Sequence, residues 1–156
     1  MLAISLREGI TQEHLQEVYS DPNMSRAGHD HREFTPIIHP LASYLTAYAG
    51  GHFAGAFLAI RSSHLEIDAH VLLKKEFTRE SRALGHQFLA WAFSKDGVQR
   101  VSANILESLE SVRNYCLRLG FEQEGFKRQA ISKDGEIGGI YMMGITKQDW
   151  SKKWVS

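Results

Sequence analysis

Residues 71–125 read VLLKKEFTRESRALGHQFLAWAFSKDGVQRVSANILESLESVRNYCLRLGFEQEG, and this stretch decides the fold. Residues 68–73 form an apolar extended run and residues 99–105 form a second one, each of a length typical of a strand. Between them, apolar residues recur at helical spacing over residues 79–93. A second amphipathic helix is predicted over residues 108–119, with a glycine directly after it, as is typical of a helix end. The order strand, helix, strand, helix favours an α/β protein with parallel central strands covered by helices.

The flanks of this stretch predict antiparallel strands. Gly50 and Gly51 between two apolar runs are typical of a tight hairpin turn, and residues 133–135 (Lys-Asp-Gly) are a second signal of this kind. The expected elements on the flanks are strands at 2–6, 43–49, 52–61, 64–73, 121–132 and 137–145, a helix at 11–19, and a tail in which Trp150 and Trp154 pack back on the body. We therefore expect an α/β (α+β mixed) sheet of about seven strands, with helices on both faces, in a single domain spanning residues 1–156.

Composition limits the class of protein. The chain has 156 residues, of which 43% are hydrophobic, which suits one domain with a sizeable core. Its 18 basic and 18 acidic residues cancel, so the net charge predicts no binding of nucleic acid. The single cysteine, Cys116, has no internal partner for a disulfide, which favours a reducing, cytoplasmic location. No apolar run approaches the roughly 20 residues of a membrane span.

Several short motifs resemble one superfamily when they are taken together at their spacings. They are Trp91-Ala92-Phe93, Gly97-Val98-Gln99-Arg100-Val101, Tyr115, Leu119-Gly120-Phe121, Glu124-Gly125-Phe126-Lys127-Arg128, Asp134-Gly135-Glu136, and Gly144-Ile145-Thr146 with Trp150. With them, residues 43–150 resemble the GNAT superfamily of N-acetyltransferases, and within it the branch that includes ribosomal-protein N-terminal acetyltransferases. The Trp-Ala-Phe element, Tyr115 and the Glu-Gly-Phe-Lys-Arg run also resemble a small group of tailed-bacteriophage proteins with an acetyltransferase-like fold, some of them head-assembly or virion accessory proteins.

The two resemblances imply different functions. The GNAT resemblance implies transfer of an acetyl group from acetyl-CoA to a primary amine of a small molecule or protein, with the cofactor between the two central parallel strands. Backbone N–H groups at Val71, Leu72 and Leu73 would polarise the thioester carbonyl. The phage resemblance implies a catalytically degenerate module that binds phage structural proteins in the host cytoplasm. The sequence leaves open which applies, and it does not fix the oligomeric state, a homodimer being one state it allows.

The cofactor turn of the superfamily has no clean counterpart. Its pattern, Arg/Gln-x-x-Gly-x-Gly/Ala, lets backbone N–H groups approach the CoA pyrophosphate. Placements at residues 76–81, 79–84 and 82–87 each lose at least one glycine. The candidate cofactor-binding residues of this bend are Arg79, Glu80, Ser81, Arg82, Ala83 and Leu84. The arginines could pair with phosphates, or lie on a solvated helix face, and the carboxylates of Glu76 and Glu80 would repel phosphates.

Proton transfer requires a base on the acceptor side. Strand alternation places Glu66, Asp68 and His70 on one face, and we expect Glu66 or His70 to take the proton from the acceptor amine, directly or through water. His70 fits better because its ordinary pKa lies near neutrality. The alternative is a polar strand face that a helix or solvent covers.

Two positions on the helix at 108–119 depart from the superfamily pattern. Leu109 stands where relatives carry an asparagine that holds the pantetheine arm. Cys116 stands where many carry a tyrosine that acts as general acid, and Tyr115 precedes it by one residue, about 100° around a helix. The resemblance implies that Tyr115, or the Cys116 thiol as a poorer substitute, protonates the leaving thiolate. As an alternative, Tyr115 is a packing residue.

Residues 23–40 are polar and histidine-rich and predict a functional loop. His29, Asp30, His31 and Glu33 could be read as a metal cluster, but their spacing is not that of a structured zinc site. A solvated loop that contacts substrate or a partner is the simpler interpretation, so no metal is predicted.

Overall fold

One mixed sheet organises the protein in the computed structural model, which describes residues 1–20, 41–133 and 135–155. Its seven strands lie in the order β1-β2-β3-β4-β5-β7-β6. The strands are β1 (Ile4–Glu8), β2 (Ala42–Ala49), β3 (His52–Arg61), β4 (Glu66–Leu73), β5 (Arg100–Leu106), β6 (Glu122–Lys133) and β7 (Glu136–Thr146). The helical elements are α1 (Gln12–Ser20), the 3₁₀ turn η1 (Lys75–Phe77), α3 (Thr78–Phe93), α4 (Glu110–Leu119), α5 (Lys147–Trp150) and the π turn η2 (Ser151–Val155). The predicted mixed sheet of about seven strands is confirmed.

Element ends differ from the prediction where a turn takes the first residues. The strand predicted from residue 64 begins at Glu66, because Ser63 and Glu66 exchange backbone hydrogen bonds in a turn. The helix predicted from residue 108 begins at Glu110, because the N–H of Leu109 donates to the carbonyl of Leu106. These local bonds compete with the regular ladder and shift each start by two residues.

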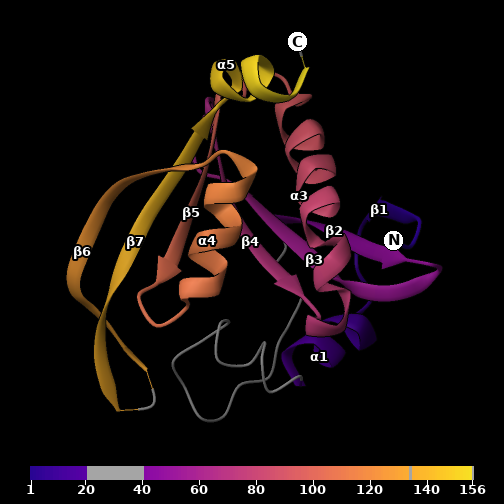
Figure 1. The fold of residues 1–156 in the computed structure, drawn as a ribbon, viewed down its shortest axis with the longest axis horizontal. Coiled ribbons are helices and arrows are strands. Elements are labelled where there is room, and N and C mark those ends of the chain that lie inside the picture. Colours follow the sequence, from indigo (N-terminus) through magenta and orange to yellow (C-terminus); the bar gives the residue numbers. More distant parts are fainter. Residues whose placement is uncertain (21–40, 134, 156) are drawn as a thin grey trace.

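The two central strands, β4 and β5, pair only briefly. They are parallel, and their pairing ends after three residue pairs, the last being Asp68 with Ser102. Beyond this point β4 continues beside β3 as far as Leu73, while β5 continues beside β7 as far as Leu106. Each strand thus follows its own half of the sheet, and Figure 1 shows β4 and β5 diverging behind α4.

Helices cover both faces of the sheet. On one face Phe57 of β3 stacks on Phe88 of α3, with ring centroids 4.8 Å apart, and on the other His14 of α1 stacks on Phe53 at 4.0 Å. A bulge in the pairing of β2 with β3 separates the two phenylalanines, so they point to opposite faces. Helices α3 and α4 lie side by side on the first face (Figure 1). We call these the α3/α4 face and the α1 face.

Turn residues and the tail follow the expected chemistry. Gly50 and Gly51 both have positive φ in the hairpin between β2 and β3, and Gly120 ends α4 in the left-handed region at φ 106°. The tail packs back as expected, because the indole N–H of Trp154 donates to the carbonyl of Leu119 over 3.0 Å. No helix in the described part of the chain is long and apolar enough to cross a membrane.

Candidate active site

A cavity of about 200 Å³ lies where β4 and β5 diverge. Residues 69–72 of β4 and 103–106 of β5 line it, together with side chains from α3 and α4. A strand that has lost its neighbour presents unpaired backbone N–H and C=O groups along that edge. Alternate backbone groups of both strands therefore face this gap, which we call the wedge, between walls that are otherwise mostly apolar.

The wedge passes through the sheet. The Ser102 hydroxyl donates to Asp68 over 2.8 Å, so both side chains lie on the same face of the two strands. His70 and Asn104 each lie two residues further along, and therefore share that face. His70 also pairs with Leu58, next to Phe57, which points to the α3/α4 face. His70 and Asn104 consequently lie on the α1 face.

The proton acceptors predicted from the sequence occupy different places. His70 lines the wedge on an exposed stretch of strand, and its partly apolar surroundings lower its pKa, a shift that the charge of Asp68 only partly opposes. The imidazole is therefore neutral, and able to accept a proton, at pH 7.

Glu66 is not among the residues that line the wedge, and its carboxylate forms an ion pair with Arg100 over 2.9 Å. Burial raises the pKa of Glu66, but polar contacts with Ser102 and Arg100, and the charge of Arg100, outweigh burial and lower that pKa overall. Such a carboxylate is a weak base.

Asn104 is a residue that sequence reasoning missed. Its exposed amide lines the wedge and makes no hydrogen bond among the described residues. The signal was present in strand alternation, because Val101, Ala103 and Ile105 are buried while the residues between them are polar. A polar residue at the end of the strand that faces His70 was a candidate for contact with the acceptor.

The predicted proton donors lie on the α3/α4 face of the wedge. Tyr115 and Cys116 both line it, but the Tyr115 hydroxyl donates to the main-chain carbonyl of Ser81 over 2.7 Å. Gly85 makes room for this contact, since a Cβ there would lie 2.4 Å from the hydroxyl oxygen. Burial raises the pKa of Tyr115 well above its ordinary value, and burial raises the pKa of Cys116 to about 12. Both groups hold their protons firmly.

The bend predicted to hold phosphates is helical throughout. Residues 75–77 form η1, and α3 follows directly without a side-chain cap among the described residues. Arg79 is exposed, whereas the guanidinium of Arg82 lies over the ring of Trp154, 5.8 Å from its centroid. The Glu80 carboxylate is buried and accepts a hydrogen bond from the N–H of Leu2 over 3.2 Å. Glu80 therefore faces β1, away from the wedge.

Of the remaining residues predicted to bind the cofactor, some line the wedge and others lie outside it. Val71 and Leu72 line the wedge, while Leu73 lies beyond the lining residues and pairs with Gly55. Leu84 is fully buried in the core, and the Ser81 hydroxyl donates to the carbonyl of Thr78. Ala83 is half-buried and outside the wedge lining. The predicted set therefore meets at the wedge only in part.

Among the described residues, no group of three or more histidine, cysteine or carboxylate side chains could hold a metal ion. The histidine-rich loop, with His29 and His31, lies outside the described residues.

The fold of this chain is similar to that of known acetyltransferases. No family model matches the chain. A similar solved structure is spermidine N-acetyltransferase from Vibrio cholerae in complex with CoA and spermine, at TM-score 0.78 and 12% identity over 94% of this chain and 97% of that one. A protein provisionally assigned as an acetyltransferase matches at TM-score 0.79 and 18% identity over 96% of this chain and 86% of that one. The chain thus has the GNAT acetyltransferase fold, as expected. The phage resemblance, and the partners and location that it implies, stay predictions.

Proposed function

We propose that the protein transfers an acetyl group from acetyl-CoA to a primary amine of a small molecule. The observation that carries this proposal is the wedge, which passes through the sheet with a neutral histidine on the α1 face. A site of this shape lets an acyl donor and an acceptor meet from opposite faces of one sheet. The GNAT fold of the chain agrees with this arrangement.

The wedge fits the thioester arm of CoA better than the bend fits its phosphates. Unpaired backbone groups of β4 and β5 offer hydrogen bonds to the amides of a pantetheine arm, and the apolar walls suit its methylene groups. The first turn of α3 has no side-chain cap from the described residues and carries the exposed Arg79, so it can attract phosphate oxygens from outside the wedge. Acetyl-CoA would supply the activated acyl group.

The residues of this chain then have separate tasks. The imidazole of His70 takes a proton from the amine as its nitrogen attacks the thioester carbon. The amide oxygen of Asn104, across the wedge, accepts a hydrogen bond from the amine and so orients it. Backbone N–H groups of β4 near Val71 and Leu72 polarise the carbonyl oxygen.

The leaving thiolate takes its proton from water in this proposal. A thiol ordinarily has a pKa of about 8.5, so transfer of a proton to its thiolate from Cys116, whose pKa is about 12, is uphill by roughly 5 kcal/mol. Burial also raises the pKa of Tyr115, whose hydroxyl donates its hydrogen bond to Ser81. Neither side chain is required as an acid, because CoA thiolate is stable enough to leave unprotonated and be protonated afterwards.

A cationic acceptor suits the α1 face. Asp68 lies two residues from His70 on that face, with one carboxylate oxygen accepting from Ser102. Its negative charge favours an amine that carries a second ammonium group. The similar structure from Vibrio cholerae was solved with CoA and spermine, which makes small polyamines the first acceptors to test.

The test is a calorimetric titration with acetyl-CoA, followed by detection of free thiol with spermidine, spermine and simple monoamines as acceptors. We expect saturable binding of acetyl-CoA, and thiol release that depends on both the amine and His70. The matched variants are His70→Gln, which removes the base, and His14→Gln, which removes an imidazole from α1. Absence of binding at millimolar acetyl-CoA would rule out the proposal.

A second function, a module that binds CoA or a protein without catalysis, is favoured by a specific observation. Both candidate acids are held in the interior, one by a hydrogen bond to Ser81 and the other by burial. For this function acetyl-CoA either binds or does not, depending on whether the module's ligand is CoA or a protein. In both cases we expect the wild-type protein to release thiol no faster than the His70→Gln variant. The same titration and assay therefore separate the two functions.

A further inference from the structure

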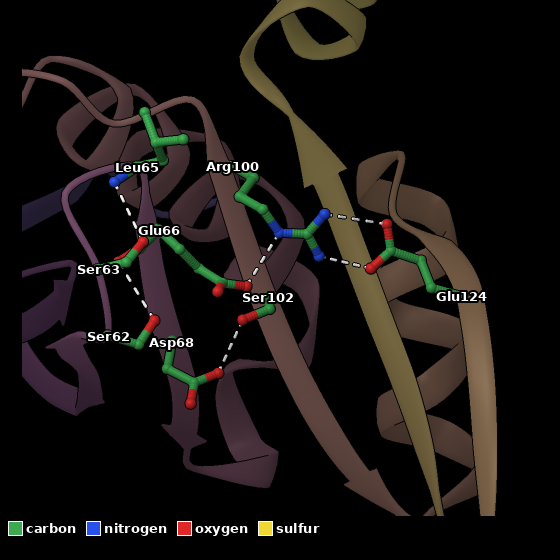
Figure 2. A network of polar contacts seen from close by, with 8 residues as sticks. All are labelled: Ser62, Ser63, Leu65, Glu66, Asp68, Arg100, Ser102 and Glu124. Atoms are coloured by element: carbon green, nitrogen blue, oxygen red, sulfur yellow. Dashed lines mark hydrogen bonds and ion pairs between the residues drawn. The ribbon is translucent and has the colours of Figure 1, made fainter.

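An ion cluster joins β4, β5 and β6 on the α1 face of the sheet. The guanidinium of Arg100, on β5, donates through Nε to Glu66 of β4 over 2.9 Å. Its two Nη groups donate to the two carboxylate oxygens of Glu124 on β6. Figure 2 shows the guanidinium between the two carboxylates, with the link to Glu124 crossing β7. We call Arg100, Glu66 and Glu124 the Arg100 clamp.

The sheet makes room for this clamp at one residue of β7. A Cβ at Gly144 would lie 2.4 Å from a carboxylate oxygen of Glu124 and 2.5 Å from Nη2 of Arg100. The absence of a side chain therefore lets the fork of Arg100 reach over β7 to β6. Glu124 itself lies in a bulge of β6, between Gln123 and Gly125, which turns its carboxylate towards the clamp.

The clamp lies at the closed end of the wedge. Arg100 and Glu66 are the first of the three residue pairs that join β4 to β5, and the strands diverge two residues later. The rest of β4 belongs to the β1–β4 half of the sheet, and the rest of β5 to the β5–β7–β6 half. A small rotation of one half against the other at this joint produces a larger displacement at the mouth of the wedge.

The chemistry of the clamp suits a fixed geometry. A guanidinium is planar, and its forked N–H groups hold two carboxylates in set directions, whereas an ammonium group is a point charge without such a fork. The side chains of Arg100 and Glu66 are 31% and 29% exposed, so water screens the pair only in part. The pKa of Arg100 is raised, mainly by its hydrogen bonds with Glu124, so the guanidinium itself stays charged.

We propose that Arg100 is a positioning residue that sets the angle between β4 and β5, and thereby the fit of the wedge to the thioester arm of CoA. This inference rests on the proposed function, since it concerns the same wedge. The role of Arg100 differs from the roles of His70 and Asn104, because Arg100 touches neither the acyl donor nor the acceptor and acts only through the two strands.

The test compares Arg100→Lys and Glu124→Gln with the wild-type protein. Both variants lose the fork geometry, and we expect the Kd for CoA to rise roughly fivefold in each. Arg100→Lys keeps the net charge and Glu124→Gln removes a negative charge, so weaker binding of an anion cannot be a charge effect. We also expect faster amide hydrogen exchange in residues 66–73 and 100–106, measured without ligand, and little change in β2.

The control variant is Glu8→Gln, which removes the charge that pairs with Lys95 and weakens the hydrogen bond accepted from Trp91, far from the wedge. We expect it to lower the melting temperature without changing the Kd for CoA or exchange at the wedge. Unchanged Kd and unchanged exchange in both clamp variants would overturn the inference, as would an equal loss of affinity in Glu8→Gln. If wild-type protein does not bind CoA, the proposed function fails, and the exchange measurement alone still decides the role of the clamp.

Discussion

Replacing Tyr115 by phenylalanine separates a structural tyrosine from a catalytic one. The substitution keeps the ring, which packs beside Gly85, and removes the hydroxyl that donates to the Ser81 carbonyl over 2.7 Å. The Ser81 carbonyl lies within α3 and keeps its place in the helix ladder, so no polar group is stranded. The loss is then one buried hydrogen bond, worth about 1 kcal/mol. For a chain of this length that corresponds to a fall of roughly 2–4 °C in the melting temperature.

The same substitution should have little effect on the rate of catalysis. A general acid contributes about 10²- to 10⁴-fold to a rate. Because the Tyr115 hydroxyl faces α3 and burial raises its pKa, we expect kcat of Tyr115→Phe to stay within about threefold of the wild-type value.

Thermal unfolding and steady-state kinetics on one preparation measure both quantities. Tyr48→Phe is the matched control, because the Tyr48 hydroxyl makes no hydrogen bond among the described residues, and we expect no change in its melting temperature. A fall in kcat of more than about 100-fold with an unchanged melting temperature would show that Tyr115 is the acid and that the structural interpretation is wrong.

Three further predictions follow from the site. The ratio of kcat/KM between wild type and His70→Gln should rise with pH with a midpoint below pH 6.5, because the partly apolar surroundings of His70 lower its pKa; a midpoint above pH 6.5 would contradict this. Glu80→Ala should lower the free energy of unfolding by about 0.5–1.5 kcal/mol, because it removes the hydrogen bond that the carboxylate accepts from the N–H of Leu2, an exposed residue. It should leave the calorimetric Kd for CoA unchanged, whereas removal of a carboxylate that lay beside the phosphates would tighten binding. Cys116→Ala should keep kcat within about threefold, and a loss above tenfold in the thiol-release assay would restore the thiol as a proton donor.

Much of the fold could be predicted because its signals are local. The helical spacing at 79–93, the glycine after α4 and the glycine pair between β2 and β3 each act within a few residues, and each predicted element is present. The predicted strand face that carries Glu66, Asp68 and His70 also holds, since alternation is a property of any strand.

The site could be predicted only in part because its contacts join distant segments. Nothing near Glu80 in the sequence indicates that its carboxylate is bonded to Leu2, 78 residues away. The hydrogen bond from Tyr115 to Ser81 depends on how closely α4 approaches α3 at Gly85, which periodicity cannot give. Glu66 was a reasonable candidate base until the structure showed the guanidinium of Arg100 beside it.

The most direct measurement of whether the wedge holds the thioester arm is a two-dimensional NMR titration of labelled protein with acetyl-CoA. We expect the largest amide shifts in residues 69–72 and 103–106, on both edges of the wedge, with a smaller group at the first turn of α3. Shifts concentrated elsewhere on the sheet, or none at millimolar acetyl-CoA, would contradict the placement of the acyl donor between β4 and β5.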